Sequence, residues 1–461
     1  MKNIIRIIIF LILLIFFTGC TAIPTDMPEA EDENFDSKNI VFKLAIISDT
    51  HINMAVGITS RKFEKTLKYL KEVAGEDLKV LMHAGDITDG GKKEEAEEFK
   101  RILDANLPQD VSFFYAVGNH DDGYIPKKFR ETFGEEYFSY DVDPDQINKG
   151  NRHAVVGGYH FITVKPAQYW NGNKGTTFLK TTLTWLTETL DSVVAEDPDK
   201  PIFVVSHSPV AEMGIGSYLP QLSTFDLKEV LINYPQVVYT NGHLHNPIQN
   251  ETAIMQDKFT TVDGGVIYYA GKDEAIEKDV FPYVVQDNLK DYNRQDHAFG
   301  TVLEIDKNNA VRITRVDYHN EAIYPVKWVI PPVKADGSHL SAYRDQERYD
   351  ADIPPYFESG ASVVCMRSSS SMAHVKFSAA KDENFVHHYK VDVYDVEADK
   401  VVYTANLESG FFRFSDMSSI QDEYVCSVKN VEDDRDYELR IRAFDSWYKE
   451  GEPLVYKFKF E

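Results

Sequence analysis

The sequence predicts an α/β layered fold followed by an all-β C-terminal domain. Two observations predict it: short apolar, strand-like runs alternate with amphipathic helices in residues 41–320, and only strand patterns remain after residue 355. A chain of 461 residues is too long for one ordinary domain. The hydrophobic content of 43% and the charged content of 27% are ordinary for a globular protein.

Five apolar runs in the first part of the chain predict short buried strands. They are residues 41–47, 78–84, 113–117, 201–205 and 237–240. Each run is followed by carboxylate, amide or imidazole side chains, in segments 49–51, 85–86, 118–121, 206–207 and 242–245. Because loops at one edge of a sheet can converge, we expect these side chains to meet in a single site.

Amphipathic helices are predicted between these strands. Apolar residues at helical spacing share one face in 63–74 and again in 96–103. Segments 178–193 and 225–231 have the same character. Strand and helix therefore alternate, which is typical of an α/β layered fold.

From Thr260 the pattern changes to strands. They are predicted at 261–269, 300–305 and 311–318, and the last two are joined by the turn-rich segment 306–309. We expect these strands to complete a second sheet of the same domain, which would cover residues 39–322.

Residues 323–355 contain two proline pairs and have weak periodicity, so we predict a Pro-containing linker there. Strands are predicted beyond it at 375–378, 389–394, 401–405, 437–444 and 454–460. In the fourth, Tyr437, Leu439, Ile441 and Ala443 alternate with polar residues, as on one face of a sandwich strand. Segment 436–444 resembles the sixth strand of a fibronectin type III domain, with Tyr437 as its corner tyrosine. This resemblance implies a fibronectin type III-like β-sandwich in residues 356–461.

The amino terminus has the layout of a secretory signal. Lys2 and Arg6 precede an apolar run at 7–17, which is too short for a comfortable membrane span. Because small residues are followed at once by Cys20, residues 1–19 resemble a bacterial lipoprotein signal peptide. The resemblance implies that Cys20 is lipidated and anchors the chain to the extracytoplasmic face of a membrane. The alternative is an ordinary cleaved signal with an incidental cysteine.

Charge and cysteine content bear on the tether, on nucleic-acid binding and on disulfide formation. Residues 20–38 are acidic and predict a solvated tether without fixed structure. The formal net charge of -25 argues against non-specific nucleic-acid binding, because phosphate backbones recruit Lys and Arg. Cys365 and Cys426 either pair in an oxidising compartment or remain buried thiols.

The five polar segments, in this order and each after a strand, resemble the calcineurin-like metallophosphoesterase superfamily. The resemblance covers residues 41–320 and includes Gly85-Asp86-Ile87-Thr88-Asp89 and Gly118-Asn119-His120-Asp121. It implies a four-layer α/β/β/α sandwich with a binuclear metal centre. The implied ligands are Asp49, His51 and His245 for the first metal, Asn119, His207 and His243 for the second, and Asp86 as a bridge. Oxygen and imidazole ligands suit two divalent ions of Mn, Fe, Zn or Co.

The same resemblance implies the reaction and its catalytic residues. A hydroxide that bridges the metals would attack a phosphate ester, and His120 would protonate the leaving group as general acid. Asp121 would support His120 or, with Asp89, orient ligands, although both could instead cap nearby helices. Purple acid phosphatases carry tyrosine at the position of Asp89, so we expect no purple chromophore.

The substrate is less constrained than the metal site. Phosphate monoesters and diesters, nucleotides among them, fit the same metal core. His153, Tyr124 and the loop at 168–173 are candidates for substrate contact, and Tyr169 and Trp170 would either stack on a base or simply pack. We interpret His83 and His160, inside predicted strands, as packing residues. The alternative function is a surface-anchored lipoprotein that binds glycan or protein on a degenerate phosphoesterase scaffold.

Overall fold

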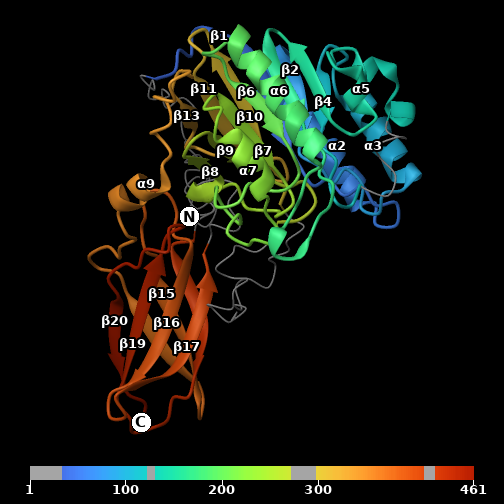
Figure 1. Ribbon diagram of the computed structural model, residues 1–461. Helices are drawn as coiled ribbons and strands as arrows, with labels where there is room; N and C mark the ends of the chain where they lie inside the picture. Colours follow the sequence, from blue (N-terminus) through green and yellow to red (C-terminus); the bar gives the residue numbers. More distant parts are fainter. Residues whose placement is uncertain (1–33, 122–129, 271–296, 410–420) are drawn as a thin grey trace, which may run out of the picture. The chain divides into compact units, whose positions relative to one another are not determined.

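The computed structural model describes residues 34–121, 130–270, 297–409 and 421–461 (Figure 1). The predicted signal peptide, Cys20 and Tyr124 lie outside the described residues. Among the residues that are described, we find no helix with the length and apolar character needed to cross a membrane.

The first sheet contains strands from both ends of the α/β part of the chain. Its strand order is β12-β11-β10-β1-β2-β3, with β13 also paired to β11. The strands are β1 (Ile40–Ile47), β2 (Leu78–His83), β3 (Ser112–Tyr115), β10 (Phe299–Asp306), β11 (Val311–Asp317), β12 (Ala322–Ile323) and β13 (Trp328–Ile330). Strands β1, β2 and β3 are parallel, and β10 is antiparallel to β1.

The second sheet has the order β4-β5-β6-β7-β9-β8. The strands are β4 (Arg152–Val156), β5 (Tyr159–Thr163), β6 (Ile202–Val205), β7 (Val237–Asn241), β8 (Ile254–Gln256) and β9 (Thr260–Asp263). The expectation that the strands after Thr260 complete this sheet is wrong for β10 and β11. They form an antiparallel hairpin whose β10 pairs with β1 in the first sheet, whereas β9 pairs with β7 in the second sheet.

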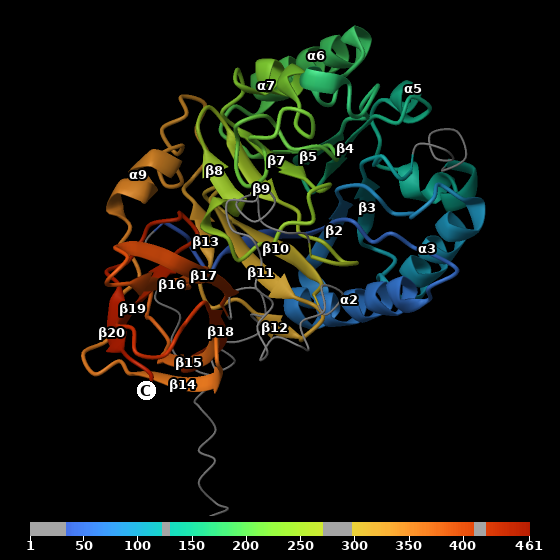
Figure 2. The same cartoon turned by 90° about the horizontal axis from the view of Figure 1, so that it is seen from below.

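Helices cover the outer faces of the two sheets, as Figure 2 shows for α2 and α3 on one side and α6 and α7 on the other. The helices on these faces are α2 (Ile58–Ala74), α3 (Lys93–Asn106), α6 (Lys180–Glu196) and α7 (Phe225–Leu231). The remaining helical segments of the described residues are η1 (Gly75–Asp77), η2 (Glu135–Phe138), α5 (Pro144–Ile147), η3 (Gly172–Lys174), η4 (Glu251–Ala253) and α9 (Asp345–Ala351). The predicted helices at 63–74, 96–103, 178–193 and 225–231 are confirmed.

Three apolar clusters separate four layers. Residues such as Leu44 and Phe161 fill the space between the two sheets. Phe63 and Phe99, whose rings stack with centroids 4.3 Å apart, pack α2 and α3 onto the first sheet. Leu186 belongs to the cluster that packs α6 and α7 onto the second sheet. The four-layer α/β/β/α sandwich is therefore confirmed.

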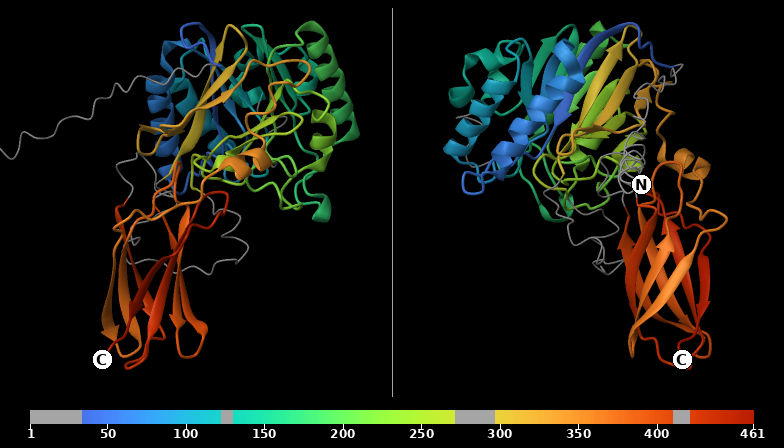
Figure 3. Two further views of the ribbon diagram at one scale, coloured as in Figure 1. Left: turned by 90° about the vertical axis from the view of Figure 1, so that its left-hand side faces the viewer. Right: turned by 180° about the vertical axis from the view of Figure 1, so that it is seen from behind.

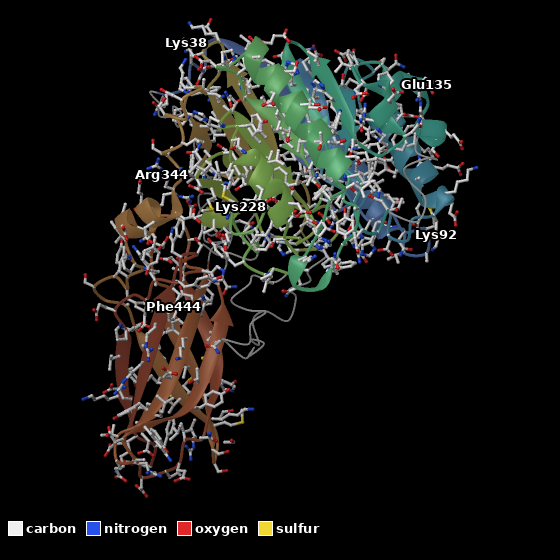
Figure 4. All side chains as sticks on the ribbon, in the orientation of Figure 1. Lys38, Lys92, Glu135, Lys228, Arg344 and Phe444 are labelled. Carbon is white, nitrogen blue, oxygen red and sulfur yellow. The ribbon has the colours of Figure 1, made fainter. Side chains whose placement is uncertain are left out.

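The start of α3 shows how polar groups at a helix end are satisfied. Lys92, labelled in Figure 4, is the residue before the helix, and its backbone N–H donates to the Glu95 carboxylate at 3.3 Å. The same carboxylate accepts from the Gly90 N–H at 2.9 Å. Glu95 thereby caps the helix that follows the second site loop.

The C-terminal strands, orange to red in Figure 3, form antiparallel sheets. The strand orders are β14-β15-β18 and β17-β16-β19-β20. The strands are β14 (Val363–Ser369), β15 (Met372–Ser378), β16 (His388–Asp395), β17 (Lys400–Glu408), β18 (Glu423–Lys429), β19 (Tyr437–Phe444) and β20 (Leu454–Phe458). One apolar cluster, including Val375, Val391 and Ile441, unites strands of both sheets. The predicted all-β sandwich is confirmed, and its fibronectin type III character remains a prediction. The Tyr437 hydroxyl accepts from the Glu432 N–H at 3.0 Å, as a corner tyrosine would.

Cys365 and Cys426 are free thiols. Both are paired in register with Val375, Cys365 from β14 and Cys426 from β18. Because β14 and β18 lie on opposite sides of β15, the Cα atoms of the two cysteines are about 10 Å apart, which is too far for a disulfide. Burial raises the pKa of Cys365 to about 11.

Two segments that the sequence predicts to be irregular contain residues that pack on the first sheet. Phe35, at the end of the predicted tether, is buried with Ala310 and Val329, and the Asp36 N–H donates to Asp306 at 2.8 Å. Apolar surface on Phe35 explains this packing. Within the predicted linker, β13 pairs with β11, so this stretch extends the first sheet. The domain boundaries themselves stay predictions.

Candidate metal centre

The five polar loops follow the carboxyl ends of β1, β2, β3, β6 and β7, as predicted. Five of their residues have a left-handed backbone: Asp49 (φ 53°), His51 (φ 46°), Asp86 (φ 56°), His243 (φ 75°) and His245 (φ 55°). Outside glycine this conformation is uncommon and costs about 1 kcal/mol or more per residue. Such strain persists only where the surrounding structure imposes it, and here it coincides with the predicted metal ligands.

The first group consists of Asp49, His51 and His245, the three predicted ligands of one metal. The Oδ1 atom of Asp49 lies 3.1 Å from Nε2 of His245 and 3.7 Å from Nε2 of His51. The Nε2 atoms of the two histidines are 3.1 Å apart. All three side chains are buried, so their polar atoms face one another and little water.

Asp86 lies between this group and a second one. Its Oδ2 atom is 3.6 Å from Nε2 of His51 and 3.1 Å from Nε2 of His207. The Oδ1 atom of Asn119 is also 3.1 Å from Nε2 of His207. Asp86 therefore has the position expected of a ligand shared between two metal ions.

His243 reaches the same place through its backbone and its ring. Its N–H donates to Oδ2 of Asp49 at 3.1 Å, and its ring centroid is 5.0 Å from that of His207. Within the described residues its Nε2 atom is buried without a hydrogen-bond partner. Burial, aided by charge on His207, lowers the pKa of His243 to about 3. A neutral imidazole is the form that binds metal. The distances given above bring all seven predicted ligands together at one site.

Hydrogen bonds behind the site set the direction of two imidazole lone pairs. Nδ1 of His245 donates to the Tyr269 carbonyl at 3.0 Å, and Nδ1 of His207 donates to the Ala84 carbonyl at 2.8 Å. In the neutral rings, each Nε2 lone pair then faces the site, beside the carboxylate oxygens described above. Acceptors that face acceptors repel one another unless cations lie between them. The donor set therefore fits two divalent ions.

The electrostatics of the site favour positive charge. Burial would lower the pKa of His207, but the carboxylates of Asp86 and Asp49 outweigh it and raise the pKa to about 9. Burial also opposes charge on His51, yet hydrogen bonds to Asp49 and Asp89 raise its pKa to about 10. Burial would raise the pKa of Asp86, but His207 outweighs it and lowers the pKa to about 2. Protons and metal ions would compete for these groups.

His120, the predicted general acid, lies at the open side of the centre. Its side chain is 42% exposed, and its ring is edge-on to His51 with centroids 4.7 Å apart. Its N–H donates to Oδ1 of Asp86 at 2.9 Å, and its Nδ1 lies 2.7 Å from the Asp89 carbonyl. Nδ1–H therefore donates to that carbonyl, which leaves Nε2 as the nitrogen that can exchange a proton. The carboxylate of Asp89 lies 3.4 Å from Nδ1 of His51.

Asp121, the second predicted catalytic residue, is fully buried and binds the polypeptide backbone. Its Oδ2 atom accepts from the N–H groups of Gly118 at 3.0 Å and Ile87 at 3.2 Å. Its Oδ1 atom accepts from the N–H of Thr88 at 2.9 Å and from the Thr88 hydroxyl at 2.8 Å. Asp121 thus joins the loop that carries Asp86 to the loop that carries Asn119. Burial and the charge of Asp86 raise its pKa.

His83 has a positioning role that the sequence analysis missed. Its Nδ1 accepts from the Gly85 N–H at 3.2 Å, so its Nε2–H donates to the Thr50 hydroxyl at 2.6 Å. Burial lowers its pKa to about 3 and keeps the ring neutral. His83 therefore connects the loop between Asp49 and His51 to the loop of Asp86. The register of β1 and β2, which pairs Ile47 with His83, was the missing information.

Asp263 at the end of β9 is a second residue that the sequence analysis missed. Its Oδ2 accepts from the Asn246 side chain at 2.9 Å and its Oδ1 from the Gly265 N–H at 2.8 Å. Burial raises its pKa to about 7. Because Asn246 follows His245 directly, Asp263 holds the end of the last ligand loop.

Two glycines permit the loops to approach. A Cβ atom on Gly118 would lie 2.0 Å from Oδ1 of Asp86, and one on Gly242 would lie 2.4 Å from Oδ2 of Asp49. Any larger residue would displace a carboxylate ligand. The glycines in these motifs are therefore required by space.

The predicted substrate contacts have different outcomes. Nε2 of His153 lies 3.0 Å from Nδ1 of His160, so these two histidines share a hydrogen bond. Tyr169 and Trp170 lie beside the metal centre, with ring centroids 6.0 Å and 5.7 Å from that of His243. Which groups touch substrate stays a prediction.

Comparisons with known proteins agree with this geometry. The family model described as calcineurin-like phosphoesterase matches residues 42–247. No curated protein has significant sequence similarity to the chain.

Among solved structures, a dimetal phosphatase from Danio rerio is 13% identical with a TM-score of 0.44, over 64% of this chain and 100% of that one. A purple acid phosphatase from yellow lupin (Lupinus luteus) seeds is 15% identical with a TM-score of 0.40, over 63% of this chain and 53% of that one. The fn3 domain of the human collagen alpha-1(XX) chain is 9% identical with a TM-score of 0.17, over 24% of this chain and 85% of that one.

The motif series, the site geometry and the match of the family model all concern the same loops. Residues 42–247 are therefore a calcineurin-like phosphoesterase domain.

Proposed function

We propose that this protein hydrolyses phosphate esters with two divalent metal ions, at the extracytoplasmic surface of a membrane to which lipidated Cys20 anchors it. One observation carries the catalytic part of the proposal. Nε2 of His207 lies 3.1 Å from Oδ2 of Asp86, and Nε2 of His245 lies 3.1 Å from Oδ1 of Asp49, while Nδ1 of each ring donates to a backbone carbonyl. A degenerate scaffold would have no chemical need for such an arrangement.

The seven predicted ligands would hold the metal pair, with Asp86 shared. When bound, the pair activates a water molecule as nucleophile near neutral pH and polarises a phosphoryl oxygen. The His120 N–H donates to Oδ1 of Asp86 at 2.9 Å and so orients the carboxylate that the two metals would share.

The proton for the leaving group would come from His120. Its Nδ1 donates to the Asp89 carbonyl, which orients the ring and leaves Nε2–H of the charged imidazole to donate to the departing oxygen. Its partly exposed position allows a substrate to approach from solvent.

The test uses the chain that begins after Cys20, loaded separately with Mn, Fe, Zn or Co. We expect hydrolysis of p-nitrophenyl phosphate or its bis ester, and the ratio of the two rates would decide between monoesterase and diesterase. Inactivity with every metal on a wide ester panel, nucleotides included, would refute the proposal. In that case the alternative, a binding lipoprotein, would be favoured if elemental analysis also found no metal.

The anchor needs a separate experiment. Cys20→Ser should abolish incorporation of labelled fatty acid and move the protein from the membrane fraction to the soluble extracytoplasmic fraction. Unchanged membrane association of this variant would contradict lipidation at Cys20 as the anchor.

A further inference from the structure

Trp170 is a large apolar side chain that is exposed beside the metal centre. Its residue exposure is 53%, and its ring centroid lies 5.7 Å from that of the predicted metal ligand His243. Burying such a ring in a complex is favourable, because it removes apolar surface from water. An indole left in water at the edge of a site therefore offers binding energy to a ligand.

The backbone conformation of Trp170 is strained. Its φ angle is 52°, in the left-handed region, which is an outlier for a bulky residue. The loop is closed on both sides of this residue. The Asn171 N–H donates to the Gly175 carbonyl at 2.8 Å, and the Thr177 N–H donates to the Gln168 carbonyl at 2.9 Å. These hydrogen bonds constrain the backbone of the loop that carries the indole.

The neighbouring Tyr169 has a different role. Its hydroxyl donates to the Val117 carbonyl at 2.7 Å, and its ring centroid is 6.0 Å from those of both His207 and His243. Tyr169 therefore packs against the ligand loops. The ring centroid of Trp170 is 6.0 Å from that of Tyr169. Trp170 therefore lies next to Tyr169 on the side that faces solvent.

We propose that Trp170 binds a planar ring of the substrate, so that aryl phosphates and nucleotides are preferred over aliphatic phosphate esters. This inference rests on the proposed function, because the metal centre would hold the phosphate while the indole stacks on the ring. Stacking of a ring on an aromatic side chain contributes about 1–3 kcal/mol. The expected preference is therefore on the order of tenfold or more.

The first experiment compares Trp170→Ala and Trp170→Phe with the wild type on p-nitrophenyl phosphate and 2-glycerol phosphate. In Trp170→Ala the ratio of kcat/KM for the two esters should fall on the order of tenfold, mainly through KM for the aryl ester. Trp170→Phe retains a ring and should restore most of the ratio. Tyr140→Ala, another exposed aromatic at 46%, is the control and should not change it.

An unchanged ratio in Trp170→Ala would overturn the inference. So would an equal loss on both esters, because Trp170 would then serve only to shape the ligand loop. Either result would leave the hydrolytic function itself intact.

The second experiment needs no turnover. Adenosine 5′-monophosphate should quench the tryptophan fluorescence of the wild type, 2-glycerol phosphate should not, and Trp170→Phe should lose the quenching although three of the four tryptophans remain. If the wild type hydrolyses no ester, the proposed function fails, and this titration still decides whether Trp170 stacks on planar rings. Absence of quenching in the wild type would overturn the inference.

Discussion

Replacement of Asp121 by asparagine tests whether this residue holds two ligand loops together or acts on the substrate. The carboxylate accepts four hydrogen bonds from three residues, and no oxygen of it is exposed. An amide group keeps one oxygen. Its NH2 group would face Thr88, because the Thr88 hydroxyl can turn and accept, whereas the N–H groups of Gly118 and Ile87 cannot.

The cost follows from these bonds. The Thr88 N–H loses its acceptor, and the remaining bonds lose the carboxylate charge. A hydrogen bond to a charged group contributes about 1.5–3 kcal/mol, so Asp121→Asn should destabilise the fold by about 2–4 kcal/mol. The loops of Asp86 and Asn119 should separate slightly, and metal affinity should fall together with activity.

Urea denaturation would measure the free energy of unfolding, and titration calorimetry would measure metal affinity. Asp110→Asn is the control, because the Asp110 side chain is 67% exposed and its ion pair with Lys79 is 3.6 Å long, a surface pair worth about 0–1 kcal/mol. Wild-type stability and metal affinity in Asp121→Asn, with a large loss of kcat, would refute the positioning role and favour a catalytic one.

Three further outcomes are expected. Gly118→Ala should abolish binding of one or both metals, measured by elemental analysis, because its Cβ would displace Asp86; full metal content would contradict this. Burial and the neighbouring Asp352 raise the pKa of Asp445 to about 8. In the unfolded chain this carboxyl group loses its proton near pH ~4. Between about pH 4 and about pH 8 the folded state therefore binds one more proton than the unfolded state, and the free energy of unfolding should fall as pH rises through this range. Asp445→Asn should flatten this dependence in urea titrations at several pH values, and an unchanged slope would contradict it. Removal of metal by a chelator should lower the Tm, since facing carboxylates and lone pairs lose their cations; an unaltered Tm would show that the folded apo site is as stable.

The sequence predicted the site better than it predicted the sheets. Each ligand follows a strand directly, so parallel neighbours such as β1 and β2 bring Asp49 and Asp86 together without further information. The partners of β10 and β11 were predicted wrongly, because an apolar pattern identifies a strand and does not identify the strand beside it.

Other features escaped for related reasons. Strand β14 was missed because its residues alternate only between partly buried and exposed positions, and Ser368 and Ser369 at its end suggest a turn. His83 has the sequence character of a core residue, and only the pairing of two strands shows that it bridges two loops. Trp170 could have been buried or exposed, since no local pattern around it determines which.

The left-handed backbone at the ligands has a consequence for how the centre acquires its metals. Such conformations are sparsely populated in a free chain, so an unfolded or partly folded polypeptide would rarely present these carboxylates and imidazoles as a chelating set. High-affinity binding must therefore wait until the strands have assembled. Metal uptake would then report on completed folding, and a misfolded chain could not compete for scarce ions.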